Sequence, residues 1–258
     1  MISIVVLSAG GDVLASAEHP EEAWLCVDRA YEPGDTVLIS GAERLLVRMD
    51  QGLPEAEVYL PAGRMTWPVP AGEHRLAYAP GTFEAPRHVI LAKALPEGAA
   101  ARVRNLALNP ADLRGDTDFF PHCRANVETR NEACFCARNV IDGVRLNTFH
   151  GEWPFQSWGI GAREDAWCEL DFGRPVVAEK MALTLRADFP HDAYWTAGHA
   201  VLSDGTDVAF SLRKTGDRQW VPLGGRLVRT VRLERLVKSD DPSAFPALTQ
   251  LEVFGRGP

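Results

Sequence analysis

Short apolar segments separated by Pro and Gly turns dominate the first hundred residues. Four such segments are TVLI, RLLV, EVYL and HVIL, at residues 36–39, 44–47, 57–60 and 88–91, and the turns EPGD, DQGLP, PAG and APGT punctuate the same stretch. Strands that recur about every ten residues between turn residues are typical of a β-sandwich. Only residues 20–29, which open with two glutamates, favour a brief helix.

Strand-like segments continue through the rest of the chain, and several alternate polar with apolar side chains, as strands with one face on a core do. They lie at residues 167–172, 180–185, 200–202, 208–212, 230–233 and 251–254. Between the halves, the small, turn-rich sequence PEGAAA is typical of a domain boundary. We predict an all-β chain with two β-sandwich domains, residues 1–98 and 99–258. One continuous sandwich with a long loop is the alternative.

Composition and charge exclude several classes of function. The 258 residues carry a net charge of −8 without a basic stripe, which argues against nucleic-acid binding. The apolar stretch at residues 4–7 is too short for a signal peptide or a membrane span. An odd number of cysteines, five, fits a reducing compartment and free thiols. We therefore expect a cytoplasmic protein without a membrane span, with non-classical export as the alternative.

Six motifs follow one another between residues 103 and 255. In order they are RNLALNP, ARNVIDG, SWGIG, DAWCELDFGRPVVAEKMALTLRADFPHD, SDGT and FPALTQLEVFG. This order and spacing resembles the coagulation factor 5/8 type C, or discoidin-like, domains, which include many bacterial carbohydrate-binding modules. The resemblance implies a galactose-binding-like jelly-roll sandwich with its ligand loops at one end. Its members mostly bind glycans and sometimes phospholipid or protein, so the loops decide the ligand.

The loop from Asp142 to Thr148 offers oxygen donors on a curled backbone, which suits calcium. The resemblance implies a structural cation here, with backbone carbonyls from two asparagines, side-chain oxygens from Asp and Thr, and a carboxylate from the last strand. The implied ligands are Asn139, Asp142, Asn147, Thr148 and Glu252. A simple Asp-Gly turn capped by Asp142 is the alternative, and Arg145 would place a positive charge near the site.

Two loops combine aromatic with charged side chains: HGEWPFQSW at residues 150–158 and RADFPHDAYW at residues 186–195. Aromatic faces stack on the C–H-rich faces of sugar rings, while carboxylates and imidazoles bind the hydroxyls. We predict that these loops form the two walls of a sugar site. The predicted ligand-binding residues are His150, Glu152, Trp153, Phe155, Arg186, Asp188, His191, Asp192, Tyr194 and Trp195.

Other roles are open for several aromatic and charged residues. Trp158 suits a core position that closes the sandwich, and Arg186 with Asp188 suits an ion pair at a strand end. The long loop at residues 238–247 carries Phe245, which suits either a lid over the ligand or an apolar cap. The aromatic cluster at residues 59–78 favours packing against the C-terminal domain or a contact in a homo-oligomer.

A zinc site is a weaker alternative. His122, Cys123, Cys134 and Cys136 offer soft ligands within fifteen residues. The pair Cys134 and Cys136 has C-x-C spacing, however, whereas zinc knuckles usually have C-x₂-C pairs. Small buried hydrophobic roles explain these thiols equally well.

No nucleophile elbow, phosphate loop, zinc-protease motif or dinucleotide fingerprint is present. We therefore predict a non-catalytic carbohydrate-binding protein with no catalytic residue and, by the resemblance, a structural calcium ion. A glycoside-acting hydrolase that uses Asp188, Asp192 or Glu152 is one alternative. A protein–protein interaction module, whose aromatic loops contact a protein, is the other.

Overall fold

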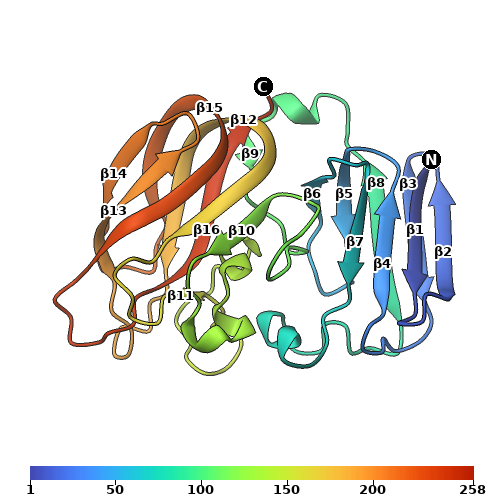
Figure 1. Ribbon diagram of the computed structural model, residues 1–258, viewed down its shortest axis with the longest axis horizontal. Helices are drawn as coiled ribbons and strands as arrows, with labels where there is room; N and C mark the ends of the chain where they lie inside the picture. The colour runs from blue at the N-terminus through green and yellow to red at the C-terminus, as the bar shows by residue number, and fades with distance from the viewer.

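The computed structural model describes residues 1–258 and places nearly all regular structure in antiparallel sheets (Figure 1). The N-terminal part is a sandwich of two four-stranded sheets, with orders β2-β1-β4-β7 and β3-β8-β5-β6. Its strands are β1 (Ile2–Leu7), β2 (Val13–His19), β3 (Glu22–Val27), β4 (Thr36–Ser40), β5 (Arg44–Arg48), β6 (Ala56–Tyr59), β7 (Arg64–Pro68) and β8 (His88–Ala94).

Residues 20–29 contain strand β3, so the prediction of a helix there was wrong. Ala23, Leu25 and Val27 are buried and the residues between them are exposed, which is the period of two that a strand requires. β3 pairs with β8 over six residues. The alternation of apolar and polar side chains therefore favours a strand. The helix prediction rested on Glu21 and Glu22, which lie just before β3 and at its first position.

The C-terminal part is one eight-stranded antiparallel sheet of order β11-β16-β12-β15-β13-β14, with β10 also paired to β12 and β9 to β16. Its strands are β9 (Arg104–Asn105), β10 (His122–Ala125), β11 (Trp158–Gly159), β12 (Cys168–Leu185), β13 (Trp195–Leu202), β14 (Asp207–Ser211), β15 (Gln219–Lys238) and β16 (Ala247–Arg256). Shifts in register divide the long pair β12 and β15, and Figure 1 shows these strands bending around the core. The prediction of an all-β sandwich is confirmed.

Two hydrophobic cores accompany the two sets of sheets. One core of 30 buried residues lies within the C-terminal sheet and contains Trp158 in its interior, as the sequence favoured. The other, of 25 residues, fills the N-terminal sandwich but also takes in Ala111, Phe119 and Ala133. The segment after the predicted boundary thus completes the N-terminal core. That residues 1–98 and 99–258 fold independently stays a prediction.

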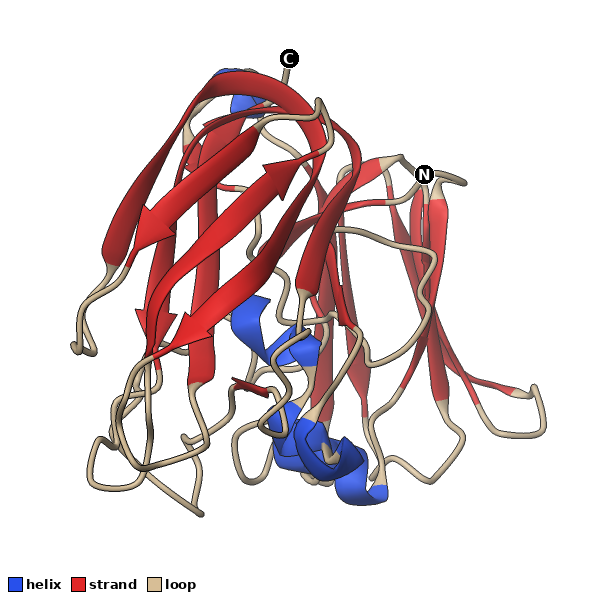
Figure 2. Cartoon of the chain, turned by 60° about the vertical axis from the view of Figure 1, so that its left-hand side comes forward, coloured by secondary structure: helices blue, strands red, loops and turns tan.

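Helical structure is confined to five short 3-10 turns, which gather mainly at one end of the molecule (Figure 2). They are η1 (Gly72–Ala77), η2 (Ala99–Ala101), η3 (Thr129–Asn131), η4 (Ala133–Phe135) and η5 (Ala137–Ile141). None of these helices has the length and the apolar character that crossing a membrane requires.

Arg138, in η5, joins the two sandwiches. Its buried guanidinium donates hydrogen bonds to the carbonyl oxygens of Pro110 (2.7 Å), Asp112 (2.8 Å) and Ala77 (3.4 Å), and it stacks on Tyr78 at 4.5 Å from the ring centre. Ala77 and Tyr78 belong to the N-terminal half. The buried guanidinium of Arg138 therefore has carbonyl acceptors on both sides of the contact between the two halves of the chain.

Candidate ligand-binding cleft

A cleft of about 930 Å³ lies where the two sandwiches meet. Its lining comes from segments far apart in the sequence: the η1 region of the N-terminal sandwich, the 3-10 turns η3 and η4, the loop before β11, the end of β12 with the loop that follows it, and the start of β16. Among the lining residues are Arg75, Tyr78, Glu84, Arg130, Glu132, Phe135, His150, Glu152, Trp153, Phe155, Arg186, His191, Asp192 and Phe245.

Seven of the ten predicted ligand residues line this one cleft. They are His150, Glu152, Trp153, Phe155, Arg186, His191 and Asp192. The loop at residues 150–158 and the loop at residues 186–195 are brought together because the second follows β12 and the first precedes β11, and both strands flank β16. Phe245, from the loop that the sequence placed over the ligand site, also lines the cleft and is half exposed.

Tyr194 and Trp195, both predicted to bind the ligand, do not line the cleft. Trp195 is 2% exposed and packs in the C-terminal core beside Trp158, with ring centres 6.0 Å apart. Tyr194 packs against the same core and faces Phe189 and Lys214. Side chains of a strand alternate between its two faces. Trp195 is the first residue of β13, and its side chain is on the face that points into the core.

Arg186 and Asp192 form a buried ion pair at the floor of the cleft, with Nε and a carboxylate oxygen 3.1 Å apart. Both side chains are less than 5% exposed. Asp192 also accepts a hydrogen bond from the Asp188 backbone N–H and lies 3.1 Å from Nδ1 of His191. The ion pair that the sequence suggested between Arg186 and Asp188 is therefore made with Asp192 instead. This pair holds the loop in shape.

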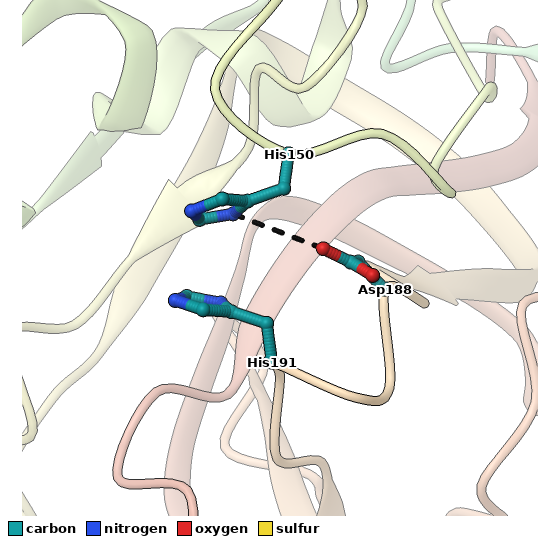
Figure 3. Close-up of side chains that lie close together, drawn as sticks. All are labelled: His150, Asp188 and His191. Atoms are coloured by element: carbon teal, nitrogen blue, oxygen red, sulfur yellow. Dashed lines mark ion pairs between the residues drawn. The ribbon is translucent and has the colours of Figure 1, made fainter.

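Two imidazoles stack above this pair. The ring centres of His150 and His191 lie 3.8 Å apart, and Asp188 lies beside them with a carboxylate oxygen 4.0 Å from His150 Nδ1 (Figure 3). His191 in turn stacks with the ring of Phe245. Asp188 itself does not line the cleft, contrary to its predicted contact with the ligand.

The imidazole of His150 sits among groups that oppose its protonation. Burial lowers its pKa below the usual value, and the positive charge of Arg186 and the neighbouring His191 lower it further. The Arg186 guanidinium donates a hydrogen bond to His150 Nδ1. The ring is therefore neutral at physiological pH, with Nδ1 as acceptor and the other nitrogen as donor.

The aromatic side of the cleft is made by Trp153 and Phe155. Trp153 is 38% exposed in its loop, and Phe155 packs edge-on against Phe135 with ring centres 5.9 Å apart. Arg130 lies over Phe135 at 5.1 Å. An exposed indole and an aromatic pair thus give the cleft an apolar part next to its charged residues.

The N-terminal wall of the cleft was not predicted. Arg75, Leu76 and Glu84 line it, and Arg75 pairs with Glu84 at 3.5 Å. Gln156 of the C-terminal half donates a hydrogen bond to the Leu76 carbonyl oxygen at 2.6 Å and so ties the two walls together. We expected the aromatic cluster at residues 59–78 to pack against the C-terminal domain or to form a contact in a homo-oligomer. Two of its residues, Arg75 and Tyr78, line the cleft.

The residues of the predicted calcium site are arranged differently from a cation cage. The side-chain nitrogen of Gln250 donates hydrogen bonds to the Asn139 carbonyl oxygen (2.8 Å) and to Oδ1 of Asp142 (2.6 Å), while its oxygen accepts from the Gly143 N–H (3.1 Å). Burial raises the pKa of Asp142 to about 7. An amide nitrogen thus bonds two of the oxygens that a calcium ion would need.

The remaining implied calcium ligands are also engaged elsewhere or point away. Glu252 forms a two-fold ion pair with Arg218, at 2.5 and 2.7 Å. The carbonyl oxygen of Asn147 accepts the Ala187 N–H, and its side chain donates to Leu185 and Gly216. Thr148 is exposed. The donor set as arranged does not fit a calcium ion, in contrast to the expectation from the resemblance.

The zinc alternative is not supported by the geometry either. His122 pairs with Asp112 at 2.7 Å, and Cys123 lies next to Cys168, whose thiol hydrogen-bonds to it and raises its pKa. All five cysteines are free thiols. The one group of three or more His, Cys, Asp or Glu side chains close enough to share a metal ion consists of His150, Asp188 and His191.

We expect calcium to leave the melting temperature of the chelator-treated protein unchanged, because Gln250 of β16 already bonds to the Asp142 loop. Gln250→Ala is expected to lower the free energy of unfolding by about 1–3 kcal/mol, since it leaves buried acceptors without donors. Thermal unfolding with and without a chelator, and urea unfolding of the variant, check this. A fall in melting temperature on chelation that calcium reverses would restore the cation site.

Comparison with known proteins finds no matching family model and no matching curated relative. Solved structures do align with a little over half of the chain. A chitosan-binding module of a chitosanase/glucanase from Paenibacillus sp. IK-5 has 20% identity, covers 59% of this chain and 99% of its own, and gives a TM-score of 0.42. A fucose binding module from Streptococcus pneumoniae has 17% identity over 58% and 96% of the two chains, with a TM-score of 0.39. The lectin domain of lectinolysin, in complex with Lewis B antigen, has 16% identity over 60% and 98%, with a TM-score of 0.42.

Proposed function

We propose that the chain binds a carbohydrate in the cleft between the two sandwiches and does not act on it chemically. The observation that carries this proposal is the joint presence of an exposed indole and of charged side chains in one concave surface. Sites for small polar ligands have this division between an apolar face and a few oriented polar groups.

Trp153 supplies the stacking face. Its neighbour Pro154 is buried, so the backbone of the loop is anchored while the indole remains 38% exposed. An exposed aromatic side chain in a surface loop costs hydrophobic free energy that a stacked sugar ring would recover. The C–H-rich face of a pyranose ring is the natural partner of such a surface.

Hydroxyl groups of the ligand would meet both donors and acceptors. Glu152 is exposed at the rim, the neutral His150 offers a donor nitrogen, and Arg75 with Glu84 adds a donor and an acceptor on the opposite wall. A hydroxyl group both donates and accepts hydrogen bonds. Neighbouring donors and acceptors therefore suit a sugar better than a ligand that carries only positive or only negative charge.

The size of the cleft favours an oligosaccharide. A volume of about 930 Å³ lies at the upper end of the range for small-molecule sites. Both sandwiches line the cleft, with Arg75 on one wall and Trp153 on the other, so an oligosaccharide would be able to contact both walls.

Geometry argues against the hydrolase alternative. Asp192 is buried and bonded to Arg186, so its carboxylate cannot turn toward a scissile bond without breaking that pair. Asp188 lies outside the cleft lining, which leaves Glu152 alone among the three carboxylates proposed for hydrolysis. Glycoside hydrolysis needs two carboxyl groups that flank the bond, and the other glutamates of the cleft, Glu84 and Glu132, are paired with Arg75 and Arg130.

Replacing Trp153 with alanine tests the proposal. Loss of one stacking face is expected to weaken binding of the strongest ligand found on a glycan array by about 5- to 150-fold, equivalent to roughly 1–3 kcal/mol. The melting temperature should change little because the indole is exposed. Titration calorimetry measures the affinity, and product analysis of the same mixtures measures hydrolysis.

Trp24→Ala provides the matched control, because Trp24 is an indole 50% exposed on the N-terminal sandwich, outside the cleft. It should bind the glycan as the parent does. Equal affinity of the Trp153 variant and the parent would place the ligand elsewhere. Release of shortened sugar would show that the chain is an enzyme, and an array without a binder would favour the protein–protein alternative.

A further inference from the structure

We propose that His150, Asp188 and His191 form a site for a divalent transition metal at the edge of the cleft, with coordination positions left open toward the cleft. The three side chains converge from two loops, one before β11 and one after β12 (Figure 3). This inference does not depend on glycan binding, and it concerns residues other than the predicted calcium ligands.

The distances are close to those of a metal site. One ligand atom from each of the three side chains lies within 4.8 Å of the other two. Tetrahedral coordination at about 2.0–2.1 Å brings ligand atoms to roughly 3.3 Å of one another, so each needs to shift by about 1 Å. His150 and His191 have side chains 43% and 45% exposed, which leaves their rings free to make this adjustment.

The kind of ligand selects the kind of metal. Two imidazole nitrogens with one carboxylate oxygen suit zinc, nickel, cobalt or ferrous iron, whereas calcium and magnesium prefer oxygen alone. Three protein ligands also leave one or more positions vacant, as in metal sites that bind a further molecule. The cleft supplies the space at those positions, because both histidines line it.

The carboxylates beside the site outnumber its one arginine. Arg186 is the nearest positive charge, but its guanidinium is paired with Asp192 at 3.1 Å. Asp188 has no lysine or arginine partner, and its one ion-pair contact is His150 at 4.0 Å. The three groups Arg186, Asp188 and Asp192 together carry one net negative charge. A metal bound through Nδ1 of His150 would displace the hydrogen bond from Arg186 and leave the Arg186–Asp192 pair in place.

Metal binding is measured directly on the full chain, without sugar. Titration of chelator-treated protein with Zn²⁺ is expected to give one site per chain. His191→Ala and Asp188→Asn are each expected to weaken it about tenfold or more, because each removes one of three ligands. Unchanged melting temperatures of the metal-free variants would confirm that folding is intact.

His199→Ala is the matched control, because His199 pairs with Asp207 at 2.7 Å on β13 and β14, outside the cleft. It should bind zinc as the parent does. Cobalt-loaded protein should lack a thiolate-to-metal absorption band, since no cysteine belongs to the site. No binding, binding that His191→Ala leaves unchanged, or a thiolate band from a site at Cys134 would each overturn the inference. Glycan binding by metal-free protein would be unaffected by that failure.

Discussion

Arg138→Met is expected to lower the free energy of unfolding by about 3 kcal/mol or more. The guanidinium is 2% exposed and bonds to three backbone carbonyl oxygens, one of which, at Ala77, belongs to the N-terminal half. Each buried acceptor that loses its donor costs about 1–3 kcal/mol. Methionine restores most of the volume, so the loss measures the missing hydrogen bonds rather than a cavity.

Urea unfolding followed by circular dichroism and by hydrogen exchange would measure the effect of Arg138→Met. If Arg138 joins the two sandwiches, amides near η1 should lose protection together with those of η5. Arg163→Met is the control, because Arg163 is about half exposed in a loop and pairs with the exposed Asp165. A variant of Arg138 as stable as the parent would show that the joint is held by the apolar contacts alone.

Asp192→Ala is expected to destabilise the protein by about 3–5 kcal/mol, because it leaves the buried guanidinium of Arg186 without its partner. Stability is lost because the Arg186 guanidinium is buried, so water cannot take the place of the Asp192 carboxylate. From the sequence, Asp192 was predicted only as a loop residue that contacts the ligand. Its 1% exposure changes that expectation.

Thermal unfolding and glycan titration of Asp192→Ala should be measured on the same preparation, so that lost binding is referred to the folded fraction. Asp188→Asn, four residues before Asp192 and without an arginine partner, should stay within about 0.5 kcal/mol of the parent. Parent-like stability of Asp192→Ala would mean that Arg186 finds water or another acceptor in the cleft.

Side-chain alternation predicted the all-β fold because burial of every second residue is a local property of a strand. β1, with Ile2, Ile4 and Val6 inside, is a clear example. The sequence also singled out the two loops that line the cleft, since an aromatic side chain in a turn stands out without reference to the fold. Trp195 lies outside the cleft because it is the first residue of β13, where the strand has already begun.

The N-terminal wall could not be predicted in the same way. Arg75 and Glu84 become part of the cleft only when the two sandwiches dock, and docking depends on contacts such as Gln156 with Leu76, 80 residues apart in the sequence. The arrangement around the predicted calcium site depends on a similar long-range contact. The Asp142 loop has oxygen atoms of the kind that calcium binds, but the side-chain nitrogen of Gln250 donates a hydrogen bond to Asp142. Gln250 is 108 residues away in the sequence, so no local motif predicts this contact.

The two chain ends lie on different sandwiches, and both are away from the end of the molecule that holds the 3-10 turns η1 and η4, which border the cleft (Figures 1 and 2). A segment joined to either end, whether a neighbouring domain, an affinity tag or a link to a solid support, would therefore leave the cleft uncovered. Attachment through a terminus would present the groove outward, toward whatever the surface is exposed to. Either terminus is therefore a suitable point of attachment when the cleft must stay accessible.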